Sequence, residues 1–414
     1  MVGRSALVVG AGVIGVNCAI ALRRRGFEVS IVDARGPGEA TSFGNAGCIA
    51  VAEITPISMP GLVWQTPRML LDPLGPLSIR WSYLPNLAPW LWRFWRAGNR
   101  RRVEEITRAL AALVGRAWTD YAPLLADAGL SHMVEHKGAL FVYETATRFA
   151  KSEEEFELRR RHGVRLTPLD RRQIAAMEPA LSSTFQYGYL NEDWRHVVDP
   201  HKLVVGLAEY FARLGGRLVR ERVAGFVVEG GRVKAARLSG GGDIACDELV
   251  VCAGAWSKPL CRALGVNVPL DTERGYNTTL PDPRVSPSRP ICPAEGNFLI
   301  TPMEMGLRIG GAVELAGLEA PPNYRRAKAL LTLGQRALPG LNITGGREWM
   351  GFRPSMPDSM PVIGRSPRQS NVYFAFGHGH LGLTEGAATG RLIGELAADE
   401  KPSIDLTPFR ADRF

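Results

Sequence analysis

The sequence predicts an α/β fold in which a Rossmann-like dinucleotide-binding domain is joined to an α+β domain. The first observation is the order of segments near the N-terminus. The apolar run of residues 6–9 leads into Gly10-Ala11-Gly12-Val13-Ile14-Gly15, then a helical pattern, then a second apolar run that ends at Asp33. The second is the length of 414 residues, which suffices for two domains. The third is the globular composition, 45% hydrophobic and 22% charged, which excludes a disordered or collagen-like chain.

The glycine-rich segment has the features that a dinucleotide site requires. Gly10 permits a tight turn, Gly12 lets backbone N–H groups approach a pyrophosphate, and Gly15 lets helix and strand pack closely. The N-terminus of the helix then faces the phosphates. Asp33 is placed to accept hydrogen bonds from an adenosine ribose, and its charge argues against the 2′-phosphate of NADP. The expected contacts in this segment are Gly10, Gly12, Val13, Ile14, Gly15, Asp33, Ala34 and Arg35.

The loop after Asp33 separates two classes of dinucleotide enzyme. An NAD dehydrogenase would continue with alternating strands and helices, whereas residues 36–47 form a loop of small and polar residues. Such a loop suits a path beneath a flavin, so FAD is favoured and NAD remains the alternative. The expected cofactor contacts in the loop are Thr41, Ser42, Asn45, Ala46 and Gly47.

Residues 41–47, Thr-Ser-Phe-Gly-Asn-Ala-Gly, resemble the flavin-contacting segment of the D-amino-acid oxidase superfamily of FAD-dependent oxidoreductases. The resemblance is closest to bacterial D-amino-acid dehydrogenases. It implies a D-amino-acid oxidase-like two-domain fold with FAD held non-covalently. The implied FAD-binding domain comprises residues 1–60, 165–262 and 345–414, and the implied substrate domain comprises residues 61–164 and 263–344.

Two later segments also resemble flavin-binding parts of this superfamily. An apolar strand over residues 248–251 ends in Ala253-Gly254-Ala255-Trp256, where small residues fit beside a cofactor. A second strand, over residues 373–376, precedes a glycine-rich turn and a helix to about residue 397, whose start directs N–H groups outward. A tight structural turn is the alternative in each case. The expected cofactor contacts are Val223, Ala253, Gly254, Trp256, Gly379, His380, Leu381, Gly382 and Leu383.

Gly351-Phe352-Arg353-Pro354 resembles the carboxylate-binding motif of the superfamily. Arginine suits this role because its planar guanidinium binds a carboxylate through two charge-assisted hydrogen bonds. The candidate catalytic residues are Arg353, Tyr276, His378 and His380. Packing of the tyrosine and structural roles for the histidines remain open alternatives. The two histidines lack further ligands and the six cysteines lack paired spacing, so no metal site is predicted.

The resemblance implies oxidative deamination of a small amino acid, preferably a D-amino acid, by hydride transfer from Cα to flavin N5. The imino acid formed would hydrolyse to a 2-oxo acid. One alternative is a secondary-amine or imino-acid dehydrogenase or oxidase acting on D-proline, hydroxyproline, sarcosine or glycine. Another is a flavin subunit that only passes electrons. A quinone or another carrier is expected as electron acceptor in preference to oxygen.

The net charge and the distribution of aromatic residues bear on where in the cell the protein lies. The net charge is +9, and residues 61–102 hold five of the nine tryptophans and end in three arginines. Aromatic rings beside arginines are typical of a membrane surface, although an insertion packed on its own domain is equally consistent. No apolar run is long enough to span a bilayer, and no signal-peptide pattern is visible. We expect a cytoplasmic protein, with peripheral contact at the inner face of the cell membrane and no nucleic-acid partner. The five tryptophans are Trp64, Trp81, Trp90, Trp92 and Trp95.

The remaining segments predict a mixture of helices and strands. One helix is expected over residues 104–127, a polar helix over 149–161, and a helix that begins at Asp199-Pro200. Further strands are expected over residues 138–143, 217–223, 225–229 and 232–238, with a hairpin over 298–313.

Overall fold

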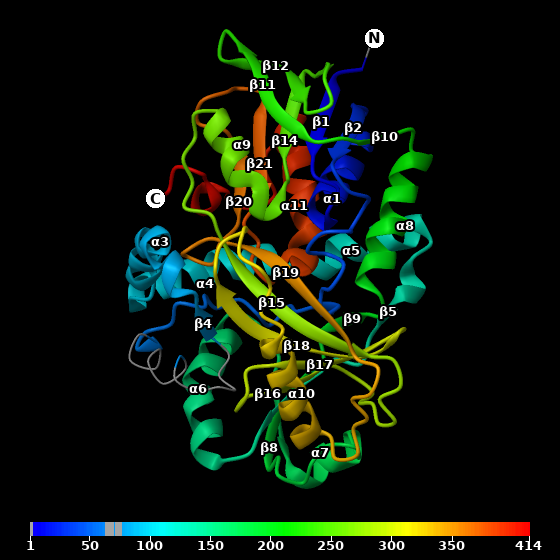
Figure 1. Cartoon of the computed structure of the whole chain (residues 1–414), viewed down its shortest axis with the longest axis vertical. Coiled ribbons are helices and arrows are strands. Elements are labelled where there is room, and N and C mark those ends of the chain that lie inside the picture. The colour runs from blue at the N-terminus through cyan, green and yellow to red at the C-terminus, as the bar shows by residue number, and fades with distance from the viewer. Residues whose placement is uncertain (1–2, 63–69, 71–76) are drawn as a thin grey trace.

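The computed structural model describes residues 3–62, 70 and 77–414. Figure 1 shows a six-stranded sheet in the upper half of the molecule and a larger mixed sheet in the lower half. Trp64 lies outside the described residues.

The six-stranded sheet is parallel except for its last strand. Its core strands are apolar on both faces, which is typical of a parallel sheet covered on both sides. Along the first strand, Ala6 and Val8 pack toward one hydrophobic core, whereas Leu7 and Val9 pack toward another. In order across the sheet, the strands are β10 (Arg217–Arg220), β2 (Glu28–Asp33), β1 (Ser5–Val9), β14 (Glu248–Val251), β21 (Val372–Phe376) and β20 (Val362–Arg365).

Helices cover one face of this sheet and a small antiparallel sheet covers the other. Gly390 permits close packing of the first and last helices of the covering layer, since a Cβ there would lie 2.6 Å from the backbone of Asn17. Asp199 caps one helix by accepting from two backbone N–H groups, as its sequence predicts. The helices are α1 (Val13–Arg23), α5 (Ala117–Ala128), α8 (Pro200–Arg213) and α11 (Gly382–Ala397); the opposite face carries β11 (Val223–Glu229), β12 (Arg232–Leu238), β13 (Asp243–Ala245) and α9 (Ser257–Ala263).

The larger sheet is mixed, and six of its strands contribute residues to the cavity described below. Its order is β19 (Arg347–Ser355), β15 (Asp271–Leu280), β18 (Gly306–Leu315), β17 (Leu299–Met303), β16 (Ile291–Pro293), β6 (Ala139–Tyr143), β8 (Tyr187–Asn191) and β7 (Thr167–Asp170), with β4 (Leu77–Ile79) beside β18. Helices α10 (Arg325–Ala337) and α7 (Arg171–Met177) contribute to its hydrophobic core.

The sheet membership of β7, β8 and β19 differs from the predicted division of the chain. That division placed these strands with the FAD-binding segments, but their hydrogen-bonded partners are strands of the larger sheet. Strand pairing over long sequence separations decides this membership, and local patterns do not reveal it. The domain boundaries themselves stay a prediction.

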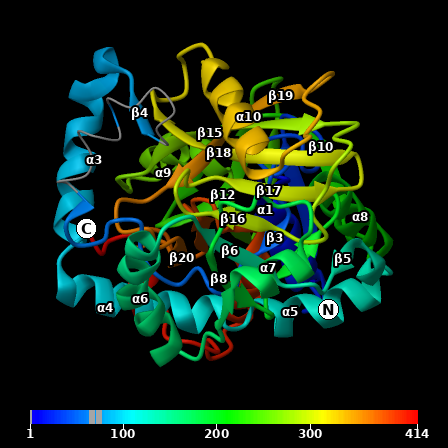
Figure 2. The same cartoon turned by 90° about the horizontal axis from the view of Figure 1, so that it is seen from below.

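The single helix predicted over residues 104–127 is wrong. The structure has α4 (Arg100–Val114) and α5 with a break at Gly115 and Arg116. Glycine is a poor helix former, and the N–H of Arg116 bonds to the carbonyl of Leu113, three residues back, so the helix tightens and ends. Figure 2 shows α3 (Leu84–Ala97), α4 and α6 (Ala146–Arg161) along the periphery of the molecule.

A three-stranded sheet completes the connection between the two halves. It consists of β3 (Cys48–Ile49), β9 (Arg195–Val197) and β5 (Val134–Glu135), and short 3-10 helices lie at residues Trp81–Tyr83, Ser131–Met133, Gly254–Trp256 and Thr407–Phe409. Within the described ranges, no helix combines the length and the apolar character needed to cross a bilayer.

Candidate active site

A cavity of about 1130 Å³ lies between the loop of residues 41–47, the turn after β21 and one face of the larger sheet. Its sheet wall alternates along each strand, because every second side chain points to the same face. The alternating lining positions are 273, 275 and 277 of β15, 308, 310 and 312 of β18, and 349, 351 and 353 of β19. Tyr276, Gly311 and Val313 also line the cavity, where a register shift between β15 and β18 interrupts the alternation. The predicted residues that the cavity brings together are Thr41, Asn45, Ala46, Tyr276, Arg353, Gly379, His380 and Leu381.

The glycine-rich turn after β1 fits a pyrophosphate. Gly10 has φ +114°, and a Cβ there would lie 2.5 Å from the carbonyl oxygen of Cys252. A Cβ on Gly15 would lie 1.8 Å from the oxygen of Gly10, so strand and helix require glycine at both positions. At Gly12 the nearest atom is Ser42 Oγ, 3.6 Å away, which leaves room beside the start of α1. The same hydroxyl accepts from the N–H of Val13 at 3.2 Å, where a phosphate oxygen would compete for that donor.

The end of β2 fits the adenosine part of a dinucleotide. Asp33 accepts from the N–H of Ala11 and from the N–H of Arg35, each at 2.7 Å. These bonds orient the carboxylate and leave lone pairs for ribose hydroxyl groups. The Arg35 guanidinium lies 5.6 Å from the centre of the Trp256 ring, and Gly254, at φ +53°, has no atom within 4 Å of a Cβ position. The Arg35–Trp256 contact brings the segments after β2 and β14 together, and the N–H of Glu221, two residues before the start of β11, donates to the carbonyl of Asp33 at 2.9 Å.

The turn after β21 fits the ring end of a flavin. Gly379 has φ +53° and open space at its Cβ position, and its N–H donates to the carbonyl of Pro354 at 2.7 Å. No side chain among the described residues caps the N-terminus of α11 at Leu381. The N–H groups at Gly382 and Leu383 therefore remain for an electron-rich group.

Arg353 occupies the sheet wall of the cavity, as the carboxylate-binding role requires. Its Nη1 donates to the carbonyl of Ala312 and its Nη2 to that of Gly311, both at 3.3 Å. Ala312, at φ +45°, forms a bulge opposite Gly275 and Tyr276, and the bulge turns these two carbonyls toward the guanidinium. Burial lowers the pKa of Arg353, and Glu273 opposes this change. In the described part of the chain, no carboxylate lies within ion-pair distance of Arg353.

Tyr276 borders the cavity, but its hydroxyl is engaged elsewhere. The hydroxyl donates to Glu314 and accepts from the N–H of Asn323 at 2.8 Å. Burial raises its pKa to about 12. This geometry favours the packing interpretation that the sequence left open.

The two histidines of the turn separate into different environments. His378 is buried, and its Nε2 lies 3.0 Å from the hydroxyl of Thr389 in α11, away from the cavity. Burial lowers its pKa to about 3. His380 is exposed to the cavity, where desolvation by the surrounding walls lowers its pKa. The burial of His378 and its contact with Thr389 favour the structural role that the sequence left open for this histidine.

The larger sheet also fixes the loop of residues 41–47. Asn277 donates from Nδ2 to the carbonyl of Gly44 at 2.8 Å, and Arg308 donates to the carbonyl of Asn45. The hydroxyl of Thr41 donates to the carbonyl of Phe352 at 2.7 Å. Sequence reasoning missed Asn277 and Arg308; their alternation with small residues along β15 and β18 was the available signal.

Glu273 and a charged cluster at another part of the cavity were also missed. Arg159 is buried and bonds to both carboxylate oxygens of Glu53 at 3.1 and 3.2 Å, and to Glu155 at 2.6 Å. A polar helix pattern did not reveal that one arginine of α6 points inward. Glu273 lies in the wall beside Arg353 and accepts from the hydroxyl of Ser355.

Comparison with known proteins identifies the family. The family model described as FAD dependent oxidoreductase matches residues 5–396. A D-amino-acid oxidase of Bradyrhizobium diazoefficiens is 37% identical over 419 residues and covers 100% of this chain and 99% of its own. A D-amino acid dehydrogenase of Paramagnetospirillum magneticum is 31% identical over 419 residues, covering 99% of this chain and 98% of its own.

Solved structures share the fold. Iminodiacetate oxidase of Chelativorans sp. BNC1 has a TM-score of 0.75 and 21% identity over 98% of both chains. L-proline dehydrogenase of P. horikoshii has a TM-score of 0.74 and 19% identity, covering 100% of this chain and 98% of that one. The predicted fold class and superfamily are thus confirmed, and the chain belongs to the family of FAD-dependent oxidoreductases that includes D-amino-acid oxidases and dehydrogenases.

Proposed function

We propose that this FAD-dependent oxidoreductase oxidises the Cα–N bond of a small amino acid, preferably a D-amino acid. The product is an imino acid, which water converts to a 2-oxo acid and ammonia. The observation that carries the proposal is Arg353, a half-buried arginine without an acidic ion-pair partner in the described ranges, in the wall of the cavity that the cofactor segments also line. The names of the two relatives support the same substrate class.

The residues of the cavity supply position and charge. Bound FAD supplies the hydride acceptor. Arg353 binds the carboxylate through two parallel hydrogen bonds and thereby fixes the direction of the Cα–H bond. The free N–H groups at the start of α11 stabilise negative charge on an electron-rich ring, in the manner of an oxyanion hole. Neither role requires a residue to move a proton; the substrate ammonium releases one proton to solvent before the hydride leaves, because the nitrogen lone pair must form the C=N bond.

We further propose that FAD is held non-covalently. Cys48 and Cys292 line the cavity, and burial raises the pKa of both thiols, so neither is a thiolate ready to form a bond to a flavin. Heat or acid denaturation should release the flavin into the filtrate. Flavin that stays on the washed, denatured chain would contradict this proposal.

An anaerobic screen for flavin bleaching tests the substrate class. The FAD-loaded enzyme is mixed with D- and L-amino acids in turn, together with D-proline, hydroxyproline, sarcosine and glycine. Bleaching by small D-amino acids with release of ammonia is the expected result. Bleaching by secondary amines alone would establish the imino-acid alternative, and a flavin that no amine bleaches would contradict the proposed oxidation.

We propose a quinone or another carrier as electron acceptor, and peripheral contact with an anionic membrane on the cytoplasmic side. Trp81, Trp92 and Trp95 are 70%, 56% and 52% exposed, and α3 also carries the exposed Arg93, between Trp92 and Trp95, and the exposed Arg96, which follows Trp95. Exposed indoles beside arginines match the headgroup region of an anionic bilayer. Trp90 does not belong to this surface, since it is 6% exposed and its Nε1 donates to the carbonyl of Ser355.

Sedimentation with anionic liposomes and stopped-flow reoxidation test these two points separately. The enzyme should sediment at low salt and be released at high salt. The Arg96→Gln variant should bind less, whereas Arg222→Gln, an exposed arginine elsewhere, should not. Reduced flavin should be reoxidised faster by a soluble quinone than by air. Reoxidation by air at the turnover rate would indicate an oxidase, and absence of sedimentation would remove the membrane contact.

A further inference from the structure

The buried Glu273 and the half-buried Arg353, which carry opposite charges, face the cavity from neighbouring strands without pairing. Glu273 of β15 is directly opposite Arg353 of β19 in the antiparallel register, so both side chains lie on the same face of the sheet. Arg353 nevertheless donates to the carbonyls of Gly311 and Ala312, and no ion pair with Glu273 is present. Buried charges are normally paired because desolvation is costly. This separation leaves both charges available to a ligand.

A hydrogen bond orients the carboxylate of Glu273 but does not use all of its acceptor capacity. Its side chain is 6% exposed, and Oε1 accepts from the hydroxyl of Ser355. Oε2 has no hydrogen-bond partner within the residues that the structure describes, although the side chain lines the cavity. A carboxylate held by one hydroxyl group retains strong acceptor capacity for a cationic donor.

The nearby acidic cluster does not offer the same capacity. Glu53 also lines the cavity, but both of its carboxylate oxygens accept from Arg159. Arg159 in turn bonds to Glu155, so its charge is compensated by two acids. Glu273 is therefore the acid that stands beside Arg353 with an oxygen free.

We propose that Glu273 binds the α-ammonium group of the substrate while Arg353 binds its carboxylate. An α-amino acid carries these two charges on one carbon atom, so a guanidinium and a carboxylate on adjacent strands match its polarity. The assignment rests on the proposed function and adds the residue that distinguishes an amino acid from a plain carboxylic acid. A ligand without the amine would leave Glu273 buried and unpaired, so the site should bind it less well than an amino acid.

The test compares two ligands on the FAD-loaded enzyme. Propanoate carries only the carboxylate, and D-alanine carries both groups; each is titrated by its perturbation of the flavin absorbance, or by KM where D-alanine bleaches the flavin. Glu273→Gln should weaken the binding of D-alanine by roughly tenfold to over a hundredfold, as expected for a lost charge-assisted hydrogen bond. Propanoate should bind this variant as tightly as the parent or more tightly. Glu273→Asp should recover part of the D-alanine affinity.

The control is Glu348→Gln. Glu348 is an exposed acid of β19 that does not line the cavity, so this substitution should change the affinity for neither ligand. Equal weakening of propanoate and D-alanine by Glu273→Gln would show that Glu273 only supports Arg353, and an unchanged D-alanine affinity would remove it from the site. D-alanine that fails to bind the parent while propanoate binds would also overturn the assignment. If D-alanine binds the parent but no amine bleaches the flavin, the oxidation is wrong, while the two-ligand comparison still decides the role of Glu273.

Discussion

Gly275 determines how the guanidinium of Arg353 lies in the cavity. A Cβ at this position would be 2.4 Å from Nη2 and 2.5 Å from Cζ of Arg353, so the planar group rests against the bare backbone. We expect Gly275→Ala to fold but to displace the guanidinium, with a loss of about 10²-fold in kcat/KM, the effect of a 1 Å misplacement. The control is Gly225→Ala, which meets open space outside the cavity. Equal kcat/KM for parent and Gly275→Ala would exclude the close packing.

Arg353 itself provides a test that separates charge from geometry. Arg353→Lys preserves the positive charge but loses the planar pair of donors. A lost charge-assisted hydrogen bond is worth about 1.5 to 3 kcal/mol, so kcat/KM should fall roughly tenfold to over a hundredfold. Steady-state kinetics with the best amino acid of the screen measures this. An unchanged specificity constant would remove Arg353 from the substrate site.

His378 makes the stability of the fold depend on pH. Its pKa falls from 6.5 to about 3 because the ring is buried, so the folded state holds it neutral. The unfolded chain takes up the proton first, and the stabilisation is therefore complete above pH 6.5 and is lost as the pH falls from 6.5 toward 3. The slope is about 1.4 kcal/mol per pH unit for one such group.

A variant isolates this contribution. Between pH 7 and 5, the free energy of unfolding of His378→Gln should fall less steeply than that of the parent, since glutamine does not titrate. His196, whose pKa burial lowers to about 4, contributes equally to both proteins, as do His136 and His380, whose pKa values desolvation also lowers. Urea unfolding at several pH values measures the difference, and parallel slopes would contradict the assignment to His378.

At the scale of elements, the bulge in β18 places a strained backbone conformation next to Arg353. Ala312 is 5% exposed and has φ +45°, a conformation that costs a residue with a Cβ about 1 to 2 kcal/mol. Ala312→Gly should keep or raise stability, whereas Ala312→Val should lower it by more than 1 kcal/mol because branched side chains avoid this conformation. Urea midpoints measure both changes. Valine tolerated at no cost would show that the bulge lacks this strain.

The same bulge contacts Arg353, the proposed substrate anchor. The carbonyls of Gly311 and Ala312 that accept from Arg353 both belong to it. Movement of the bulge in Ala312→Val should therefore reduce kcat/KM as well as stability. A fall in both stability and kcat/KM would indicate a displaced bulge, whereas a fall in kcat/KM alone would indicate an effect confined to the cavity.

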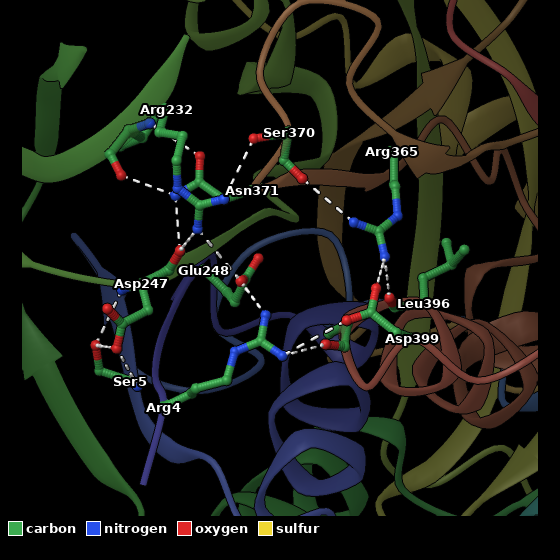
Figure 3. Close-up of polar contacts among 12 residues, drawn as sticks. Arg4, Ser5, Arg232, Asp247, Glu248, Arg365, Ser370, Asn371, Leu396 and Asp399 are labelled. Carbon is green, nitrogen blue, oxygen red and sulfur yellow. Dashed lines mark hydrogen bonds and ion pairs between the residues drawn. The ribbon is translucent and has the colours of Figure 1, made fainter. Parts of the chain in front are cut away.

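At the scale of the whole molecule, the cavity and a polar network that supports stability lie at opposite ends of the strands of the six-stranded sheet. The cavity lies at the carboxyl ends of the parallel strands, whereas Figure 3 shows a polar network at their amino ends. Arg4 bonds to the buried Glu248, Arg232 lies 3.7 Å from the same carboxylate, and Asn371 donates to the carbonyl of Asp247 at 2.7 Å. The network ties β1, β12 and β14 to the segment before β21.

Glu248→Gln should therefore lower stability without altering catalysis. Its side chain is 2% exposed, and its loss leaves Arg232 without an anionic partner among the described residues and Arg4 with only the exposed Asp399, at a cost of about 1 to 3 kcal/mol. Asp399→Asn, whose side chain is 68% exposed, should cost less than 1 kcal/mol and serves as the control. Urea midpoints and kcat/KM are measured on both. A marked change in kcat/KM for Glu248→Gln would show that the two ends of the sheet are coupled.

The sequence by itself determined the parts of this protein whose residues are contiguous. The glycine turn after β1 and the acid at the end of β2 each depend on spacing within one segment, and spacing is readable along the chain. The arginine motif of β19 is also contiguous, and its resemblance to a known family made it a candidate. Tertiary structure alone decided which distant strands pair, and so which side chains share a wall. It placed Glu273 beside Arg353, laid the guanidinium against Gly275, turned His378 into the core and buried Trp90. The physical reason is that local patterns specify strands and helices, whereas register between remote strands follows from the burial and hydrogen bonding of the complete fold.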